Sequence, residues 1–259
     1  NPPEKDSLEL WTSLTWLASN TQRIEFGPLV TPVSFRDPVF TARIAKDVDD
    51  LSGGRLILGV GAGWQEREHH MFGYDLMPPA QRFARFEEGL DVITHLLQDA
   101  GRVNHSGSHY TLRDAALLPR PQRPGGPPIL IGGNGPRRTL PLVARYGHEW
   151  NGVYVTAERF AALSQQLDTL LAAQGREPGA VRRSLMTNVI FGSSETTLRD
   201  KLAGRDATAL RQRGLIVGTA PAIRDQLLRL AEAGVQRVML QWLDQDDLAG
   251  LETLAQAVL

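Results

Sequence analysis

Residues 55–64, Arg55-Leu56-Ile57-Leu58-Gly59-Val60-Gly61-Ala62-Gly63-Trp64, form a short apolar strand that runs directly into glycines and then into helical sequence. Residues 128–135, Pro128-Ile129-Leu130-Ile131-Gly132-Gly133-Asn134-Gly135, repeat this arrangement. Glycine lets backbone N–H groups approach a ligand and permits positive φ. The N-terminus of a helix adds unpaired N–H donors and a positive dipole end, which suit a phosphate. The two segments therefore predict a phosphate-bearing cofactor at the C-terminal edge of a parallel sheet.

Strands and helices alternate along the whole chain. The main strands are expected at residues 23–33, 55–60, 128–132, 150–155, 184–191 and 237–242. Alternation without an internal repeat predicts an α/β fold with a parallel sheet, either doubly wound or a barrel. Six β/α units in 259 residues amount to about three-quarters of a TIM (β/α)8 barrel. We expect a single domain over residues 1–259 from which the first β-α-β unit is missing, and the loop-like start at Asn1 agrees with this.

The composition excludes several classes of protein. The net charge of −1 gives no indication of nucleic acid or an anionic membrane as a partner. The chain has no cysteine, which excludes disulfides and thiolate chemistry and is compatible with a cytoplasmic location. No apolar run approaches the roughly 20 residues that span a bilayer. We therefore expect a cytoplasmic protein whose partner is a small molecule.

Two helix starts carry clear local signals. Residues 6–9, Asp-Ser-Leu-Glu, have the form of a capping box. Asp37-Pro38 begins a second helix, because proline is favoured in the first turn, and Gly53-Gly54 ends it. The apolar stripe expected to face the core on this helix is Phe40, Ile44, Val48 and Leu51.

Four segments together resemble a known family. They are GPLVTP at 27–32, RDP at 36–38, LSGGRL at 51–56 and GVGAGW at 59–64. The chain resembles the luciferase-like monooxygenase superfamily, and within it the coenzyme F420-dependent oxidoreductases, in order over nearly its whole length. The resemblance implies a TIM barrel, a homodimer, and transfer of a hydride between the deazaflavin C5 and a small organic substrate. It assigns no catalytic residue, because the family's usual acid/base histidine lies in the unit that is missing here.

The resemblance also implies where the cofactor binds. A bulge with a non-prolyl cis peptide, here mapped to the Pro28–Leu29 bond, supports the back of the ring. The turn at 61–64 approaches the ring system, Arg67 lies within reach, and the phosphate lies near the turn at 132–135. The implied cofactor-binding residues are Pro28, Leu29, Val30, Gly61, Ala62, Gly63, Trp64, Arg67, Gly132, Gly133, Asn134 and Gly135.

Each of these features also has a structural interpretation. Pro28 fits an ordinary strand end, Trp64 fits a packing residue, and the turn at 132–135 fits a tight turn that binds nothing. Arg120 and Arg123 either meet the acidic tail of F420 or keep a surface loop soluble. The six histidines form no metal set, so no metal is expected.

Three other functions remain open. An FMN-dependent monooxygenase of the same superfamily uses oxygen instead of hydride chemistry. A non-catalytic flavin-binding barrel protein holds the cofactor without turnover. A TIM-barrel lyase or isomerase acting on a phosphorylated metabolite needs a placed lysine or paired acids. The last is disfavoured because neither Lys46 nor Lys201 lies at a strand end.

Overall fold

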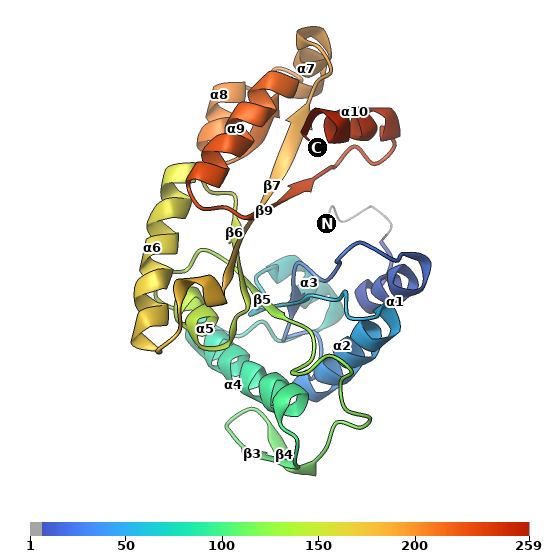
Figure 1. Cartoon of the computed structure of the whole chain (residues 1–259), viewed down its shortest axis with the longest axis vertical. Coiled ribbons are helices and arrows are strands. Elements are labelled where there is room, and N and C mark those ends of the chain that lie inside the picture. The colour runs from blue at the N-terminus through green and yellow to red at the C-terminus, as the bar shows by residue number, and fades with distance from the viewer. Residues whose placement is uncertain (1–6, 259) are drawn as a thin grey trace. The chain divides into compact units, whose positions relative to one another are not determined.

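The computed structural model describes residues 7–258 and divides into two compact units (Figure 1). The first unit comprises Asn1–Gly132 with Tyr146–His148, and the second comprises Gly133–Arg145 with Glu149–Leu259. Among the described residues no helix has the length and apolar character needed to cross a membrane.

The first unit is built on three parallel strands. They are β1 (Thr31–Pro32), β2 (Leu58–Gly61) and β5 (Ile129–Gly132). The helices of this unit are α1 (Leu10–Asn20), α2 (Pro38–Ser52), α3 (Glu66–Phe72) and α4 (Pro79–Gln98). An antiparallel hairpin, β3 (Val103–Ser106) and β4 (Thr111–Ala115), follows α4. The core of the unit consists of fully buried side chains of the strands and of α4, among them Leu58, Val60, Leu90, Ile93 and Ile129.

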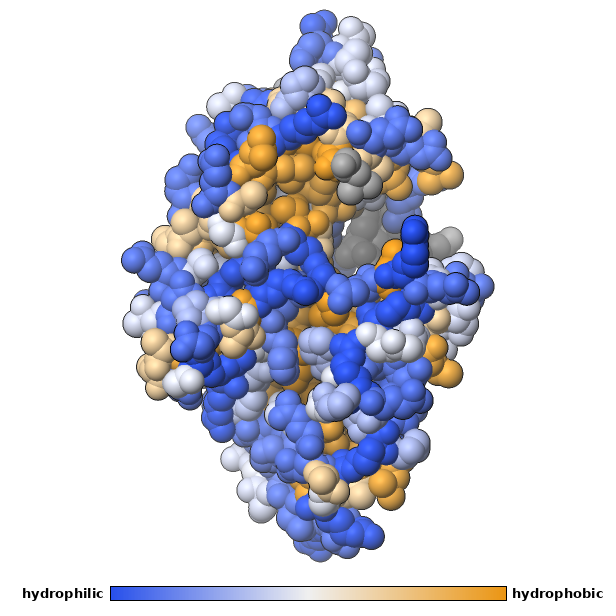
Figure 2. All heavy atoms as spheres, in the orientation of Figure 1, coloured by the Kyte–Doolittle hydropathy of each residue, from blue (hydrophilic) through white to orange (hydrophobic). Residues whose placement is uncertain are grey.

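The second unit is organised by one long strand. The strand β7 (Arg182–Phe191) pairs in parallel with β6 (Glu149–Val153), β8 (Ile216–Gly218) and β9 (Arg237–Gln241). The residues of β9 remain partly exposed, and Figure 2 shows apolar side chains gathered in this part of the unit. The remaining elements are α5 (Thr139–Tyr146), α6 (Ala157–Ala173), the 3-10 helix Pro178–Ala180, α7 (Glu195–Leu202), α8 (Ala207–Gln212), α9 (Ala220–Glu232) and α10 (Leu248–Val258).

The strand predicted at 23–33 is wrong for most of its length. Only Thr31 and Pro32 lie in a strand, and a single bridge joins Phe26 to Leu56. Gly27 lies so close to strand β2 that a Cβ atom would stand 1.9 Å from the Ile57 carbonyl oxygen. This close approach and the missing N–H of proline interrupt regular pairing.

The helix α2 confirms its predicted ends but not its predicted stripe. Asp37 caps its first turn by accepting from the Val39 N–H at 2.8 Å, and Gly53 ends it with a φ of 69°. However, Phe40 and Leu51 are 53% and 63% exposed. The face toward the core is instead made by Ala42, Ala45, Val48 and Asp49. Small alanines let α2 pack closely on its neighbours α1 and α4, an effect that apolar spacing alone does not reveal.

The first helix starts with a different cap from the one expected. Glu9 is the N-cap of α1, and its side chain accepts from the Thr12 N–H at 2.8 Å. Asp6, the predicted cap, lies outside the described residues. A carboxylate next to the first helical turn satisfies an orphan N–H from either position, so the sequence pattern did not decide between them.

Hydrogen bonds of the Arg55 side chain connect the C-terminal end of α1 to the segment that precedes β2. Its side chain donates to five oxygen atoms. They are the carbonyl oxygens of Ala18, Thr21, Ile24 and Ser52 and the Thr21 hydroxyl. A planar guanidinium can hold this many acceptors at once, whereas an ammonium cannot reproduce the fork geometry.

We therefore expect Arg55→Lys to lower the free energy of unfolding by about 1 kcal/mol, because partly buried carbonyl groups lose their donor. Urea denaturation measures this change. The matched control is Arg43→Lys on the exposed side of α2, which should stay within about 0.5 kcal/mol of the parent. Equal effects of the two substitutions would contradict this role of Arg55.

Candidate functional site

Glycines of β2 let the segment before β1 lie directly against the strand. A Cβ atom at Gly61 would stand 2.6 Å from Cγ2 of Val30, and one at Gly59 would stand 1.9 Å from the Pro28 carbonyl oxygen. The cis peptide expected in this segment is present, but it joins Leu29 to Val30 rather than Pro28 to Leu29. The sequence marks the bulge by its proline and glycine but contains no signal for the bond within it.

A buried histidine lies beside the turn that follows β2. His69 is 2% exposed, and its Nδ1 lies 2.7 Å from the Gln65 carbonyl oxygen. Because a carbonyl oxygen only accepts, Nδ1 carries the hydrogen. Nε2 therefore accepts from the Ser34 hydroxyl, which lies 2.7 Å away. Sequence reasoning missed this pair because the two residues are far apart in the chain and belong to no local motif.

Two further contacts fix the same turn. Arg82 donates from Nη1 to the Gly63 carbonyl oxygen at 2.9 Å and from Nε to the Leu76 carbonyl oxygen at 3.1 Å. A Cβ atom at Gly63, which has a φ of 88°, would stand 2.9 Å from the Ser34 hydroxyl oxygen. Trp64 is 77% exposed, so the alternative in which this side chain packs in the core is wrong. The first unit thus brings Pro28–Val30 and Gly61–Trp64 to the carboxyl edge of its strands, with Arg67 on α3.

The turn after β5 is held in place by its own unit. The Gly133 N–H donates to the Asn151 carbonyl oxygen at 2.9 Å, and the Trp150 indole donates to the Gly133 carbonyl oxygen at 2.9 Å. The Asn134 carboxamide forms two hydrogen bonds with the backbone of Val153, at 2.7 and 2.9 Å. Both backbone polar groups of Gly133 are therefore used in hydrogen bonds within the fold. The N–H groups of Asn134 and Gly135 have no acceptor within the described chain, and they are the available anion donors of this turn.

The helix that follows the turn at 132–135 does not begin directly after its last glycine. The helix α5 starts at Thr139, and the N–H groups of Thr139 and Leu140 both donate to the Gly135 carbonyl oxygen. Pro136 lies in the preceding turn, because residues 136–138 form a turn rather than the first helical turn. A phosphate at this place would depend on the N–H groups of residues 134 and 135 more than on a helix dipole.

The sequence also failed to identify a polar cluster at the carboxyl edge of the second unit. The Tyr154 hydroxyl, just after β6, lies 2.8 Å from Oδ1 of Asn188 on β7 and 2.7 Å from Oε1 of Gln241 on β9. Tyr154 has a φ of 50°, and burial raises the pKa of its phenol. Polar residues near the carboxyl ends of predicted strands could have indicated this cluster, because active sites of (β/α) barrels lie at the carboxyl edge of the sheet.

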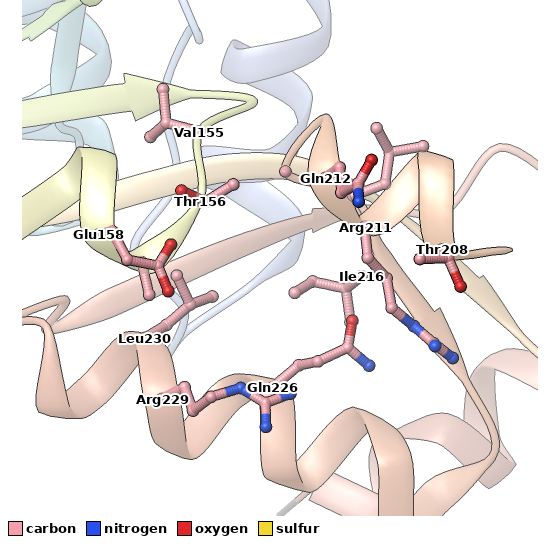
Figure 3. Close-up of a pocket in the computed structure, with 13 residues that line it drawn as sticks. Val155, Thr156, Glu158, Thr208, Arg211, Gln212, Ile216, Gln226, Arg229 and Leu230 are labelled. Carbon is pink, nitrogen blue, oxygen red and sulfur yellow. The ribbon is translucent and has the colours of Figure 1, made fainter.

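The second unit also contains a pocket of about 280 Å³ that lies among helices (Figure 3). Glu158, Arg211 and Arg229 give its lining both signs of charge. Arg211 donates to the Val217 carbonyl oxygen, and Arg229 pairs with Asp225. The cluster of Tyr154, Asn188 and Gln241 does not line this pocket, and the mixed charges indicate no particular ligand.

Arg120 and Arg123 are structural. Arg123 forms an ion pair with the buried Asp49 at 3.2 Å, and Arg120 donates to the Leu96 and Gly101 carbonyl oxygens. Burial raises the pKa of Asp49 in spite of this ion pair. In the described part of the chain no three His, Asp or Glu residues lie together as metal ligands would.

The sequence profile of luciferase-like monooxygenases matches residues 2–213. A phthiodiolone/phenolphthiodiolone dimycocerosates ketoreductase of Mycobacterium kansasii is 30% identical over 251 residues, covering 94% of this chain and 66% of the relative. The chain spans less than two-thirds of the length of the first curated relatives that it matches.

Solved structures resemble the whole chain. An F420-dependent secondary alcohol dehydrogenase in complex with an F420–acetone adduct superposes with a TM-score of 0.81 at 16% identity, over 92% of this chain and 80% of the other. A riboflavin lyase with modified FMN superposes with a TM-score of 0.82 at 14% identity, over 98% and 73%. These likenesses confirm the predicted α/β fold of the TIM-barrel class.

The hydrogen bonds of His69 lead to a test by NMR. In a long-range 1H–15N spectrum we expect the uncharged ring to carry its hydrogen on Nδ1, because that nitrogen faces the Gln65 carbonyl oxygen. Ser34→Ala should shift the Nε2 resonance by removing its donor, while the exposed His70 should be unaffected. A hydrogen found on Nε2 of His69 would contradict the assignment.

Proposed function

Because the chain belongs to the luciferase-like monooxygenase family, we propose that it is an oxidoreductase that uses coenzyme F420. The observation that carries the proposal is the pair of glycine turns at the carboxyl ends of β2 and β5. The names of similar proteins support it, since one relative is a ketoreductase and one structural neighbour is an F420-dependent secondary alcohol dehydrogenase. The expected substrate is a small organic molecule that gains or loses a hydride.

The residues present fit such a cofactor. In the first unit, Gly59 and Gly61 leave no room for a Cβ atom because Pro28 and Val30 pack directly on them, so residues 28–30 and 61–64 lie side by side where a flat ring would rest. In the second unit, the N–H groups of Asn134 and Gly135 are donors for a phosphate. Gly132, the last residue of β5, belongs to the first unit and begins the same glycine turn. Trp64 and Arg67 would flank the ring. The bound deazaflavin supplies the hydride, whereas the chain binds and orients it.

An FMN-dependent monooxygenase is the second candidate. It is favoured by the likeness to the riboflavin lyase with modified FMN and by a pyrimidine monooxygenase among the relatives. The glycine turn of β2 accepts a flavin ring as readily as a deazaflavin ring. Homodimer formation and a cytoplasmic location remain predictions.

The decisive experiment is a titration of the protein with F420 and, separately, with FMN, following quenching of its five tryptophans. Binding of F420 at least tenfold tighter than that of FMN supports the proposal, and turnover of reduced F420 without oxygen would complete it. Preference for FMN together with oxygen uptake would establish the second candidate. Binding of F420 without any turnover would indicate a cofactor-binding protein that is not an enzyme.

Gly61→Ala tests the glycine turn itself. A Cβ atom there must displace Val30, so we expect cofactor affinity to fall at least tenfold. Gly101→Ala is the matched control, because a Cβ atom at Gly101 meets nothing within 4 Å. Circular dichroism verifies that both variants fold. Unchanged affinity in a folded Gly61→Ala protein would remove residues 61–64 from the proposed site.

A further inference from the structure

The carboxyl edge of the second unit holds a polar cluster that the cofactor assignment does not use. Tyr154 follows β6, Asn188 lies within β7 and Gln241 ends β9, and the three side chains meet at one phenol oxygen. Tyr154 is 37% exposed and both amide residues are partly exposed, so a ligand can reach the cluster. Tyr154 also has a left-handed backbone conformation, which is uncommon for a residue other than glycine and is often associated with functional sites.

The hydrogen bonds of the cluster are incomplete. A phenol carries one hydrogen, yet two carboxamide oxygens face it, so one of them lacks a donor at any moment. The two carboxamide nitrogens have no hydrogen-bond partner within the described chain. The cluster therefore offers an acceptor for one hydroxyl hydrogen and N–H donors for one oxygen. A secondary alcohol matches the first demand, and the corresponding ketone matches the second.

The surroundings select an uncharged and apolar ligand. By strand register Met186 pairs with Met239, and Asn188 pairs with Gln241, so each pair lies level across β7 and β9. Side chains two residues apart on a strand share a face, which places the methionines next to the amides. Methionine adapts its shape to apolar groups. Within the described chain, the hydrogen bonds that join the three cluster residues involve neutral groups, which suits an uncharged ligand.

We propose that Tyr154, Asn188 and Gln241 bind the reacting oxygen of a neutral, lipophilic ketone or secondary alcohol, with Met186 and Met239 against its apolar part. This rests on the proposed function and adds the substrate class. The Tyr154 hydroxyl donates its one hydrogen to the carboxamide oxygen of Asn188 or of Gln241, and the amides present their N–H groups to the substrate. Asn151 on β6 pairs with Ser184 on β7, and its Oδ1 is buried without a hydrogen-bond partner. This oxygen is a further acceptor for a polar group of the ligand.

The test compares a variant that removes a hydrogen-bond donor to the substrate with one that removes the hydroxyl that orients the amides. Gln241→Glu keeps an oxygen for the Tyr154 hydroxyl but removes the N–H donor, and Tyr154→Phe removes the hydroxyl that donates to one or the other carboxamide oxygen. Gln236→Glu is the matched control on the same part of the chain, because its side-chain oxygen only accepts from the Arg183 N–H at the amino end of β9. The probes are 2-nonanone and 2-oxononanoate, which adds a carboxylate to the same carbonyl.

We expect the parent and Gln236→Glu to bind 2-nonanone, followed by saturation-transfer NMR, at least tenfold more tightly than 2-oxononanoate. Gln241→Glu and Tyr154→Phe should lose about tenfold in affinity for 2-nonanone while their affinity for F420 stays unchanged. If the parent binds the ketone in this way without oxidising reduced F420, the substrate site stands and the proposed function fails. If the two variants bind 2-nonanone as the parent does, or if the keto acid binds better, the proposed site is overturned.

Discussion

Parallel strand pairing is the constraint on which the rest of this structure depends. In each unit it brings every strand of the sheet to a common edge with its carboxyl end, so residues far apart in sequence meet there without a local motif. In the first unit this edge carries the close contact between residues 28–30 and Gly61. In the second unit it carries Asn134 and Tyr154, and the long strand β7 aligns its neighbours. The sites follow from the pairing rather than from any single loop.

Polar groups at the two ends of the second unit's strands differ in how fully they are paired. At the amino end the buried Glu149 lies 3.8 Å from Arg182 and 3.6 Å from Arg237, so a carboxylate is compensated by two guanidinium groups. Arg183 is likewise engaged, since it donates to Asp168 and to the Val181 carbonyl oxygen. These contacts stabilise the fold, although Oε1 of Glu149 is buried without a hydrogen-bond partner. At the carboxyl end, donors and acceptors are left over, which is the condition of a binding site rather than of a core.

Much of the fold was predictable because it depends on local patterns. Glycines and β-branched residues located β2 and β5, and proline and glycine located both ends of α2. The extended segment at 23–33 was not predictable as an irregular strand, because its close approach to Ile57 is a tertiary contact. The Ser34–His69 pair and the cluster around Tyr154 depend on partners 34 to 87 residues apart. Such pairings arise from strand order, and a single sequence gives no spacing rule for them.

The backbone of Tyr154 limits how this protein can diverge. A φ of 50° is tolerated by few residues other than glycine, asparagine and aspartate, and it is particularly unfavourable for β-branched ones. Asn188 and Gln241 lie on regular strands that accept almost any side chain. Descendants of this sequence that acquire new chemistry should therefore change at positions 188 and 241, while position 154 changes slowly because its backbone conformation adds a restraint to that of its hydroxyl.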